Sequence, residues 1–280
     1  MKVEIIAGGF AFPEGPRWHD GRLWFADQHD GRVHVLAADG AAIEDFAVPG
    51  GPSGMGWLPD GDLLVVSMLE RRLYRRHGGE LAIHADFAGL HPGHTNDMVV
   101  DRQGRAYVGN IGFDFDQGAE PGPTILTLVR PDGTVEIAAE DMLCPNGSVI
   151  TDDGKRLIVA ESMAGRLAAF DIDPDGGLSN RRIFAEIGDH VPDGICIDAD
   201  DLVWVASPFA NEVIRVAEGG AIVDRISTGD VQPYACMLGG DDGRSLYICC
   251  ATDHDRKKTV AARAGRIAMT RVAVPHGGRP

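Results

Sequence analysis

Short stretches in which apolar and polar side chains alternate recur along the whole chain. Ile195 and Ile197, followed by Leu202, Trp204 and Ala206, occupy alternate positions on either side of an aspartate-rich turn. Alternation with a period of two residues is the pattern of half-buried β-strands. This stretch therefore predicts two short strands joined by a tight turn.

The turn and second strand of this unit occur six times, at Asp20–Asp27, Asp60–Ser67, Gln103–Asn110, Asp153–Ala160, Asp200–Ala206 and Asp242–Cys249. Most copies begin with Asp-Gly, which suits a hairpin turn because both residues tolerate positive φ. A third strand is predicted after each copy, at Arg32–Leu36, Arg72–Arg76, Thr124–Val129, Arg166–Phe170, Glu212–Val216 and Arg266–Val272. A fourth strand usually follows, as at Ala42–Ala47, Val135–Ala139, Arg182–Ala185 and Ile222–Ser227.

Four strands repeated about every 40–50 residues are typical of a β-propeller blade. We therefore predict an all-β fold, a six-bladed β-propeller with four-stranded blades, as a single domain over residues 1–280. A plain β-sandwich is the alternative, but its strands do not repeat with this self-similarity. We expect Val3–Ala7 and Ile267–Val274 to share the blade that closes the ring.

Composition narrows the function classes. The chain has 44% hydrophobic residues, 24% charged residues and 37 glycines, as expected of a turn-rich globular protein. No apolar run approaches the ~18 residues of a membrane span, and the first residues lack the apolar region of a signal peptide, so we expect a cytoplasmic protein. The net charge of −16 argues against nucleic acid and membrane partners and is compatible with a cation site. Five cysteines without a CxxC motif suggest neither a disulfide framework nor a zinc ribbon.

One position at the entrance to the first strand of each blade, called the slot here, carries the candidate chemistry. In blades one to six the slot holds Glu14, Ser53, Asn96, Asn146, Asp193 and Ala235. Equivalent positions of a propeller lie on a ring around the central channel. We therefore expect these residues, distant in sequence, to converge.

Glu14, Asn146 and Asp193 each have a proline before them and a glycine after them. Two carboxylates and an amide carbonyl form an all-oxygen ligand set that suits Ca²⁺, Mg²⁺, Mn²⁺ or Zn²⁺. Three protein ligands leave positions open for water and substrate, as a catalytic metal ion requires. The alternative is that these residues only cap turns. Their common register and prolines favour the metal site.

The slot motifs carry a family resemblance. They comprise Phe12–Trp18 with Leu23–Asp27, then Thr95–Asp97, Pro145–Gly147, and Pro192–Asp198 with Leu202–Ala206. With these motifs in order, the chain resembles the SMP-30/gluconolactonase (regucalcin-like) family over nearly its whole length. The resemblance implies a six-bladed propeller with one divalent metal ion near its axis and hydrolysis of a small lactone. It also implies Glu14, Asn146 and Asp193 as metal ligands, Asp193 as the base, and Asn96 as a substrate contact.

The chain departs from the family at His94, where members acting on sugar lactones often carry arginine. Histidine is shorter and, with an unperturbed pKa of about 6.5, is largely uncharged at neutral pH. The long loop Asn110–Pro123 adds Phe113 and Phe115, and long loops on rigid scaffolds often determine specificity. We therefore expect His94, Phe113 and Phe115 to contact a substrate less hydroxylated than a sugar lactone.

Three other interpretations stay open. The propeller could bind metal without catalysis, because a fold alone does not define a function. A family member could also have been recruited to elimination, isomerisation or cyclisation of a cyclic or carbonyl substrate. His91 and His94 form a weaker candidate for a second metal site, since such histidines are more often solvent-facing. Arg256–Lys258 is expected to be a solvated loop.

Overall fold

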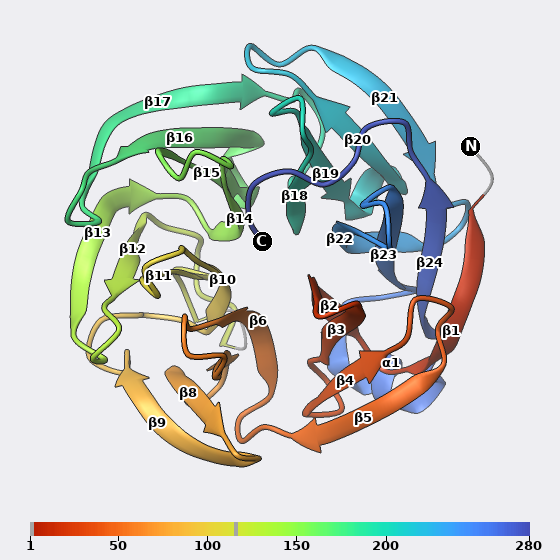
Figure 1. Ribbon diagram of the computed structural model, residues 1–280, viewed down its shortest axis with the longest axis horizontal. Coiled ribbons are helices and arrows are strands. Elements are labelled where there is room, and N and C mark those ends of the chain that lie inside the picture. The colour runs from red at the N-terminus through yellow and green to blue at the C-terminus, as the bar shows by residue number, and fades with distance from the viewer. Residues whose placement is uncertain (1–2, 115–116) are drawn as a thin grey trace.

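The computed structural model, which describes residues 3–114 and 117–280, consists of six four-stranded antiparallel sheets around a central axis (Figure 1). The predicted all-β, six-bladed propeller is thus confirmed. In five sheets the strands follow chain order from the axis outwards, while the sixth sheet takes its outermost strand from the start of the chain.

Blades one to three cover the first half of the chain. Blade one consists of β2 (Pro13–His19), β3 (Arg22–Asp27), β4 (Arg32–Leu36) and β5 (Ala42–Ala47). Blade two consists of β6 (Pro52–Trp57), β7 (Leu63–Ser67), β8 (Arg72–His77) and β9 (Glu80–Asp86). Blade three consists of β10 (Thr95–Val100), β11 (Ala106–Asn110), β12 (Thr124–Val129) and β13 (Val135–Met142).

Blades four to six complete the ring. Blade four consists of β14 (Pro145–Ile150), β15 (Arg156–Glu161), β16 (Arg166–Ile172) and β17 (Leu178–Glu186), with the 3₁₀ turn η2 (Ser162–Ala164). Blade five consists of β18 (Ile195–Ile197), β19 (Val203–Ser207), β20 (Glu212–Val216) and β21 (Ile222–Ser227), with η3 (Pro208–Ala210). Blade six consists of β22 (Gln232–Gly239), β23 (Ser245–Ala251), β24 (Gly265–Arg271) and β1 (Glu4–Phe10), with α1 (Arg256–Ala262).

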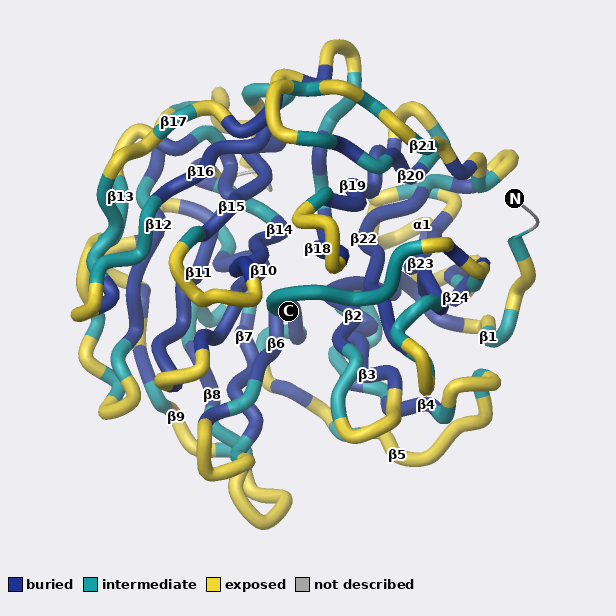
Figure 2. Tube along the Cα trace, turned by 45° about the horizontal axis from the view of Figure 1, so that its top comes forward, coloured by how far each residue is buried: buried dark blue, intermediate teal, exposed yellow. Residues whose placement is uncertain are grey.

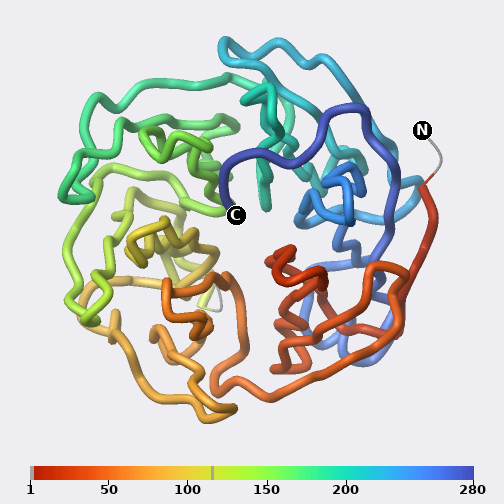
Figure 3. The backbone as a smooth tube through the Cα atoms, viewed as in Figure 1, coloured from red at the N-terminus to blue at the C-terminus, as the bar shows by residue number. Residues whose placement is uncertain are grey.

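The two ends of the chain meet in blade six, as predicted. Strand β1 pairs antiparallel with β24 from Glu4 opposite Met269 to Phe10 opposite Gly265. Figure 3 shows the red β1 beside the blue β24 at the edge of the ring. This pairing closes the ring without joining consecutive strands.

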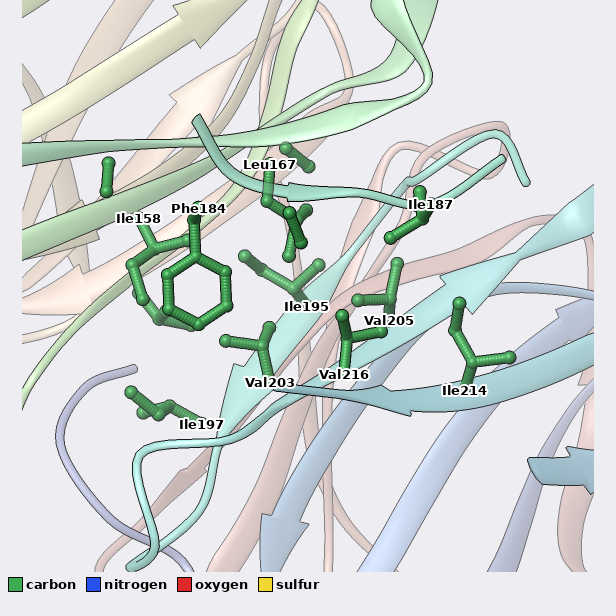
Figure 4. Packing of buried hydrophobic residues seen from close by; sticks show 14 residues of the cluster. Ile158, Leu167, Phe184, Ile187, Ile195, Ile197, Val203, Val205, Ile214 and Val216 are labelled. Atoms are coloured by element: carbon green, nitrogen blue, oxygen red, sulfur yellow. The ribbon is translucent and has the colours of Figure 1, made fainter. Parts of the chain in front are cut away.

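The core lies between neighbouring blades. Inner strands are buried and outer strands largely exposed (Figure 2). Between blades four and five, Ile158 and Phe184 pack with Ile195, Val203 and Val205 in one apolar cluster (Figure 4). Burying apolar surface between sheets is the main favourable contribution to such a fold, so the position of each blade depends on its neighbours.

The propeller has two distinct ends because its strands are antiparallel. Each innermost strand starts at the end that also carries the loop between the second and third strands of its blade, here called the slot end. The opposite end carries the Asp-Gly turns and is called the tail end, because residues 275–280 cross it near the axis (Figure 1). There Arg279 forms an isolated β-bridge with Ile150, and His276 forms one with Asp198.

The predicted loop at Arg256–Lys258 was wrong, because these residues begin the helix α1 at the slot end. The Asp255 side chain accepts a hydrogen bond from the Lys257 backbone N–H and so caps the helix. Good helix formers, two lysines and two alanines, follow within one short segment. None of the helices in the described part of the chain has the length and apolarity needed to cross a bilayer.

Candidate active site

The slot residues lie where the innermost strands begin. Glu14, Ser53, Asn96 and Asn146 are the second residues of β2, β6, β10 and β14. Asp193 stands two residues before β18, and Ala235 lies within β22. The sequence-based alignment of the six copies therefore places equivalent residues at the same end of the axis.

A one-residue bulge accompanies the slot. The pairing of β2 with β3 shifts between Glu14 and Arg17, and β14 shifts against β15 between Pro145 and Ser148. A bulge inserts an unpaired residue and changes the direction of neighbouring side chains. The bulges therefore let slot side chains deviate from the regular alternation of the strand.

The glycine that follows the slot allows adjacent inner strands to approach closely. A Cβ atom on Gly147 would lie 2.5 Å from the backbone nitrogen of Ile195. On Gly194 it would lie 2.3 Å from the Cβ atom of Ala235. Both contacts are too short for a side chain, so glycine here keeps the slots of successive blades close together.

The slot residues of blades one, four and five converge at the axis. Burial and then the negative charge of Asp193 raise the pKa of the Glu14 carboxyl well above its usual range. Burial also raises the pKa of Asp193 to about 7, while a hydrogen bond from the Asn146 side chain lowers it. Glu14 is buried, whereas Asn146 and Asp193 are partly exposed. A ligand can therefore reach these two oxygen-bearing side chains.

The centre also contains Asp97, which sequence reasoning did not single out. Asp97 is buried and its charge contributes to the raised pKa of both Glu14 and Asp193. Its carboxylate lies 2.5 Å from a terminal nitrogen of the buried Arg17 guanidinium. The signal was present in the sequence, because Asp97 follows the slot residue Asn96, whereas the other four oxygen-bearing slots are followed by glycine.

Arg17 fastens blade one to its neighbours. Its Nε atom donates to the Met55 carbonyl of blade two at 2.9 Å. Its Nη2 atom donates to the Met98 carbonyl of blade three at 2.7 Å, besides pairing with Asp97. Arg17 thus links blades one, two and three, and its positive charge also lowers the pKa of Glu14.

The polar network extends from the slots into the surrounding loops. The Asn146 amide donates to the Ser162 hydroxyl at 3.2 Å, and Ser162 donates to the Pro192 carbonyl at 2.7 Å. In blades two and three, the Ser53 hydroxyl lies 3.5 Å from the side-chain oxygen of Asn96, which is buried. These contacts hold the amide groups of Asn146 and Asn96 in defined orientations.

The predicted substrate-binding residues fall in two groups. His94 is partly exposed two residues before Asn96, and Phe113 packs close by, because a Cβ atom on Gly93 would lie 2.2 Å from the Phe113 carbonyl oxygen. Phe113 is itself only 8% exposed, so most of its ring faces protein. Phe115 lies outside the described residues.

His91 is not solvent-facing, which corrects that expectation. Its ring is 1% exposed and stacks on Phe87 with centroids 4.7 Å apart. Its nitrogens lie 2.9 Å from the Thr95 hydroxyl and 3.3 Å from the Thr127 hydroxyl. Burial and the nearby Arg71 lower its pKa to about 3. Because both ring nitrogens lie within hydrogen-bond distance of threonine hydroxyls, His91 is a buried structural residue of blade three.

A second acidic group lies in blade one, where ligand-type atoms of Asp27, Asp30 and His34 come within 4.8 Å of one another. Two backbone N–H groups at the start of the blade donate to Asp27, each at 2.8 Å. Asp30 pairs with the Arg263 guanidinium at 3.0 and 3.1 Å. Asp27 is therefore held by backbone donors and Asp30 by an arginine.

Fold and site together define a six-bladed propeller with an acidic centre at one end of its axis. The model of the SMP-30/gluconolactonase/LRE-like region matches residues 12–252, which contain all six slots. The chain belongs to the SMP-30/gluconolactonase/LRE-like family, as the slot motifs predicted.

Named relatives include enzymes and calcium-binding proteins. The 6-deoxy-6-sulfogluconolactonase of Pseudomonas putida is 25% identical over 265 residues, which cover 92% of this chain and 89% of that protein. Regucalcin of Danio rerio is 31% identical over 160 residues, covering 56% of this chain and 54% of the relative. That alignment thus spans about half of regucalcin. The solved structure of regucalcin from Agrobacterium tumefaciens, described as a calcium-binding protein, matches with a TM-score of 0.84 at 22% identity, covering 100% of this chain and 96% of that chain. This last match shows the shared fold.

Proposed function

We propose that this protein is a lactonase that depends on one divalent metal ion, with Glu14, Asn146 and Asp193 as the ligands. The observation that carries the proposal is the charge at the slot end of the axis. Three carboxylates, those of Glu14, Asp97 and Asp193, influence one another there, and Arg17 is the cation that contacts this group among the described residues.

The residues present fit a divalent cation. Three carboxylates and one guanidinium leave two negative charges, and a buried carboxylate without a counter-charge is unfavourable. A divalent ion would neutralise both charges. The donors are oxygens, which hard cations prefer, and partial exposure of Asn146 and Asp193 provides access. A set of turn caps would not require this excess of buried acid.

The chemistry that a bound divalent ion supplies is Lewis-acid polarisation of the ester carbonyl. Asp193 accepts the proton of the attacking water as the general base. Asn96, held by its contact with Ser53, orients the substrate through its side-chain amide. The Asn146 side chain is oriented by its hydrogen bond to Ser162. It also donates a hydrogen bond to Asp193 and so positions that carboxylate.

The substrate class follows from the family and from the departure at His94. The Pseudomonas putida relative is named for a sugar lactone, which supports a lactone as the substrate. His94 stands two residues before Asn96, and the Phe113 backbone lies against Gly93; together they offer fewer hydrogen-bond donors than an arginine would. From the sequence alone, we add Phe115 to these proposed substrate contacts. The preferred lactone is accordingly less hydroxylated than an aldonolactone.

The identity of the metal ion and the compartment belong to the same proposal. The calcium-binding relative favours Ca²⁺ over Zn²⁺, Mn²⁺ and Mg²⁺. All five cysteines are buried free thiols, as is usual in the reducing cytoplasm. We therefore propose a cytoplasmic enzyme acting on a small-molecule lactone.

The test is a lactone panel with controlled metal. Protein stripped with a chelator is assayed by pH-stat against gluconolactone and alkyl- or aryl-substituted γ- and δ-lactones, alone and with each of the four ions. We expect hydrolysis that returns with at least one ion. Product mass separates hydrolysis, which adds water, from rearrangement. Full activity in the stripped protein would contradict metal dependence.

Metal content of variants tests the ligand set. Glu14→Gln, Asn146→Ala and Asp193→Asn each remove a ligand or its charge and should lower the metal bound at limiting ion. Ser53→Ala is the matched control, since Ser53 occupies the slot of blade two without being a proposed ligand. Wild-type metal content in all three variants, measured by elemental analysis, would refute the assignment.

A further inference from the structure

Four short loops at the slot end repeat the same turn. In blade one the turn ends at Gly31 (φ 72°) with His29 two positions earlier, whereas the other three carry a large apolar residue there. In blades two, four and five, the loop between the second and third strands ends in a residue with left-handed backbone: Arg71 (φ 54°), Gly165 (φ 62°) and Asn211 (φ 53°). Two positions before each of these stands a large apolar residue, Leu69, Met163 or Phe209. Met163 and Phe209 are the middle residues of η2 and η3.

These three side chains are exposed to solvent. Leu69 is 47% exposed, Met163 50% and Phe209 65%. The other exposed large apolar residues of the described chain are of two kinds. One lies on the outermost strand of each blade (Ile5, Ile43, Ile83, Ile137, Ile183 and Val223), and two lie on slot-end segments (Leu90 and Val260). None of those residues occupies a tail-end turn, so exposed apolar loop residues are confined to the end that carries the candidate site.

One of the three turns is hydrogen-bonded to a proposed metal ligand, and the strand that leads into another turn is hydrogen-bonded to a second ligand. Ser162, the neighbour of Met163, accepts a hydrogen bond from Asn146 at 3.2 Å. The Asp193 N–H donates to the Ala206 carbonyl at 3.0 Å, three residues before Phe209. The Phe209 ring also meets His254 of blade six edge to face, with centroids 6.4 Å apart. The exposed apolar residues are therefore built on the same segments as the site.

We propose that Leu69, Met163 and Phe209 form an apolar rim that binds a hydrocarbon substituent of the substrate. Isolated exposed apolar residues are common on surfaces, but here one recurs at the same turn position in three blades, at the end of the axis that carries the candidate site. A hydroxylated sugar ring has little apolar surface to cover such a rim. The inference rests on the proposed lactonase function and narrows its substrate to an uncharged lactone that carries an alkyl chain or ring.

The test measures how activity depends on chain length. The kcat/KM is determined with saturating metal for γ-lactones whose side chain grows from none to five methylenes. A fully buried methylene contributes about fourfold and a half-buried one about twofold. The wild-type protein should therefore prefer the longest substrate by ~30-fold over the shortest. The Met163→Ser/Phe209→Ser double variant should reduce this ratio to below about fivefold.

Matched controls come from the outer strands. Ile183→Ser and Val223→Ser remove side chains that are 51% and 50% exposed but lie away from the slot end. Both controls should keep the wild-type ratio. Sedimentation of all variants tests whether the rim joins two copies instead.

Four results would overturn the inference. Metal-dependent hydrolysis of short and long lactones at equal rates would leave the lactonase proposal standing and remove the rim. An unchanged ratio in the double variant, or its dissociation from a dimer with no effect of chain length in the wild type, would also remove the rim. Failure to hydrolyse any lactone with any of the four ions would remove both proposals.

Discussion

Carboxylates are buried at both ends of the propeller axis, but the groups that surround them differ. At the tail end, Asp198 is fully buried and accepts hydrogen bonds from two backbone N–H groups and from Arg215, the last at 2.7 Å. Asp101 is 4% exposed and pairs with Arg105 at 2.5 Å. At the slot end, Glu14 and Asp193 face each other's charge instead.

The difference separates structural acids from functional ones. A buried carboxylate is tolerated when donors and a counter-charge surround it. Tail-end acids meet that condition within their own blade, where they hold the turn between its first and second strands. Slot-end acids come from different blades and share a deficit of positive charge. Strongly perturbed groups of this kind cluster at functional sites, and here a cation would remove the deficit.

The largest expected effect comes from replacing one functional and one structural aspartate by asparagine. Asp193→Asn keeps one oxygen but removes the proton acceptor, so kcat at saturating metal should fall by ~10²–10⁴-fold with little loss of stability. Asp198→Asn should instead cost about 3 kcal/mol or more in the free energy of unfolding, because it weakens a buried ion pair. Steady-state kinetics and urea unfolding of both variants check this contrast. A near-normal kcat for Asp193→Asn would move the base elsewhere.

Asp97 sharpens the comparison because it lies at the slot end but has a dedicated cation. Asp97→Asn should leave the Arg17 guanidinium buried without its carboxylate and cost about 3–5 kcal/mol in the free energy of unfolding. Ser53→Ala, in the neighbouring slot, is the control for a change without loss of charge. If urea unfolding showed no difference between these variants, the Arg17–Asp97 pair would not stabilise the fold.

Ionisation of Asp193 should reduce the stability of the apo protein as pH rises from about 4 to 7. A folded-state pKa raised to about 7 means that Asp193 binds more protons in the native than in the unfolded state across this window, so the free energy of unfolding falls with rising pH. Glu14, with its pKa also raised, acts in the same direction. The slope is at most about 1.4 kcal/mol per pH unit for each proton.

Buried histidines make the protein more stable as pH rises and so oppose the effect of Asp193. The wild type is therefore compared with a variant that lacks this carboxyl. The lowered pKa of His91, about 3, favours stability at higher pH. Subtracting the pH profile of Asp193→Asn from that of the wild type isolates the carboxyl. Saturating metal should flatten the difference, since the ion binds the ionised form. A difference that rises with pH in the apo protein would reverse the interpretation of Asp193.

The smallest expected effect concerns His94, the proposed substrate contact that replaces an arginine. His94→Arg should shift the ratio of kcat/KM toward gluconolactone, relative to an alkyl γ-lactone, by about tenfold, because a matched polar group is worth about 1–3 kcal/mol. The ratio is measured at saturating metal. A tenfold preference for gluconolactone in the wild type would show that histidine is merely tolerated here.

Local sequence patterns were sufficient to predict the fold. Alternating strands and a tight turn repeat once per blade, so one copy predicts the next. Four of the turns begin with Asp-Gly, and Glu14, Asn146 and Asp193 share one register in three blades. The closing pair of strands was also predicted, because a propeller ring normally closes by combining strands from both ends of the chain. The helix α1 was missed because it interrupts the repeat, although Asp255 is a capping residue.

The parts of the site that escaped prediction depend on contacts between blades. The ion pair of Arg17 with Asp97 joins residues 80 positions apart. His91 is buried because Thr127, 36 residues away, meets its ring. Neither partner can be identified from spacing alone. The burial of Phe113 likewise depends on how its loop packs against Gly93.

The shared sixth blade has a consequence for the order of folding. Glu4 pairs with Met269, so the strand made early in synthesis must wait for one made near the end. At about 5–20 residues per second, that interval is roughly 10–50 seconds. Until then β1 has no partner strand, and the ring stays open between blades six and one. Contacts of such long range slow folding, so closure of the ring should be the late step during biosynthesis.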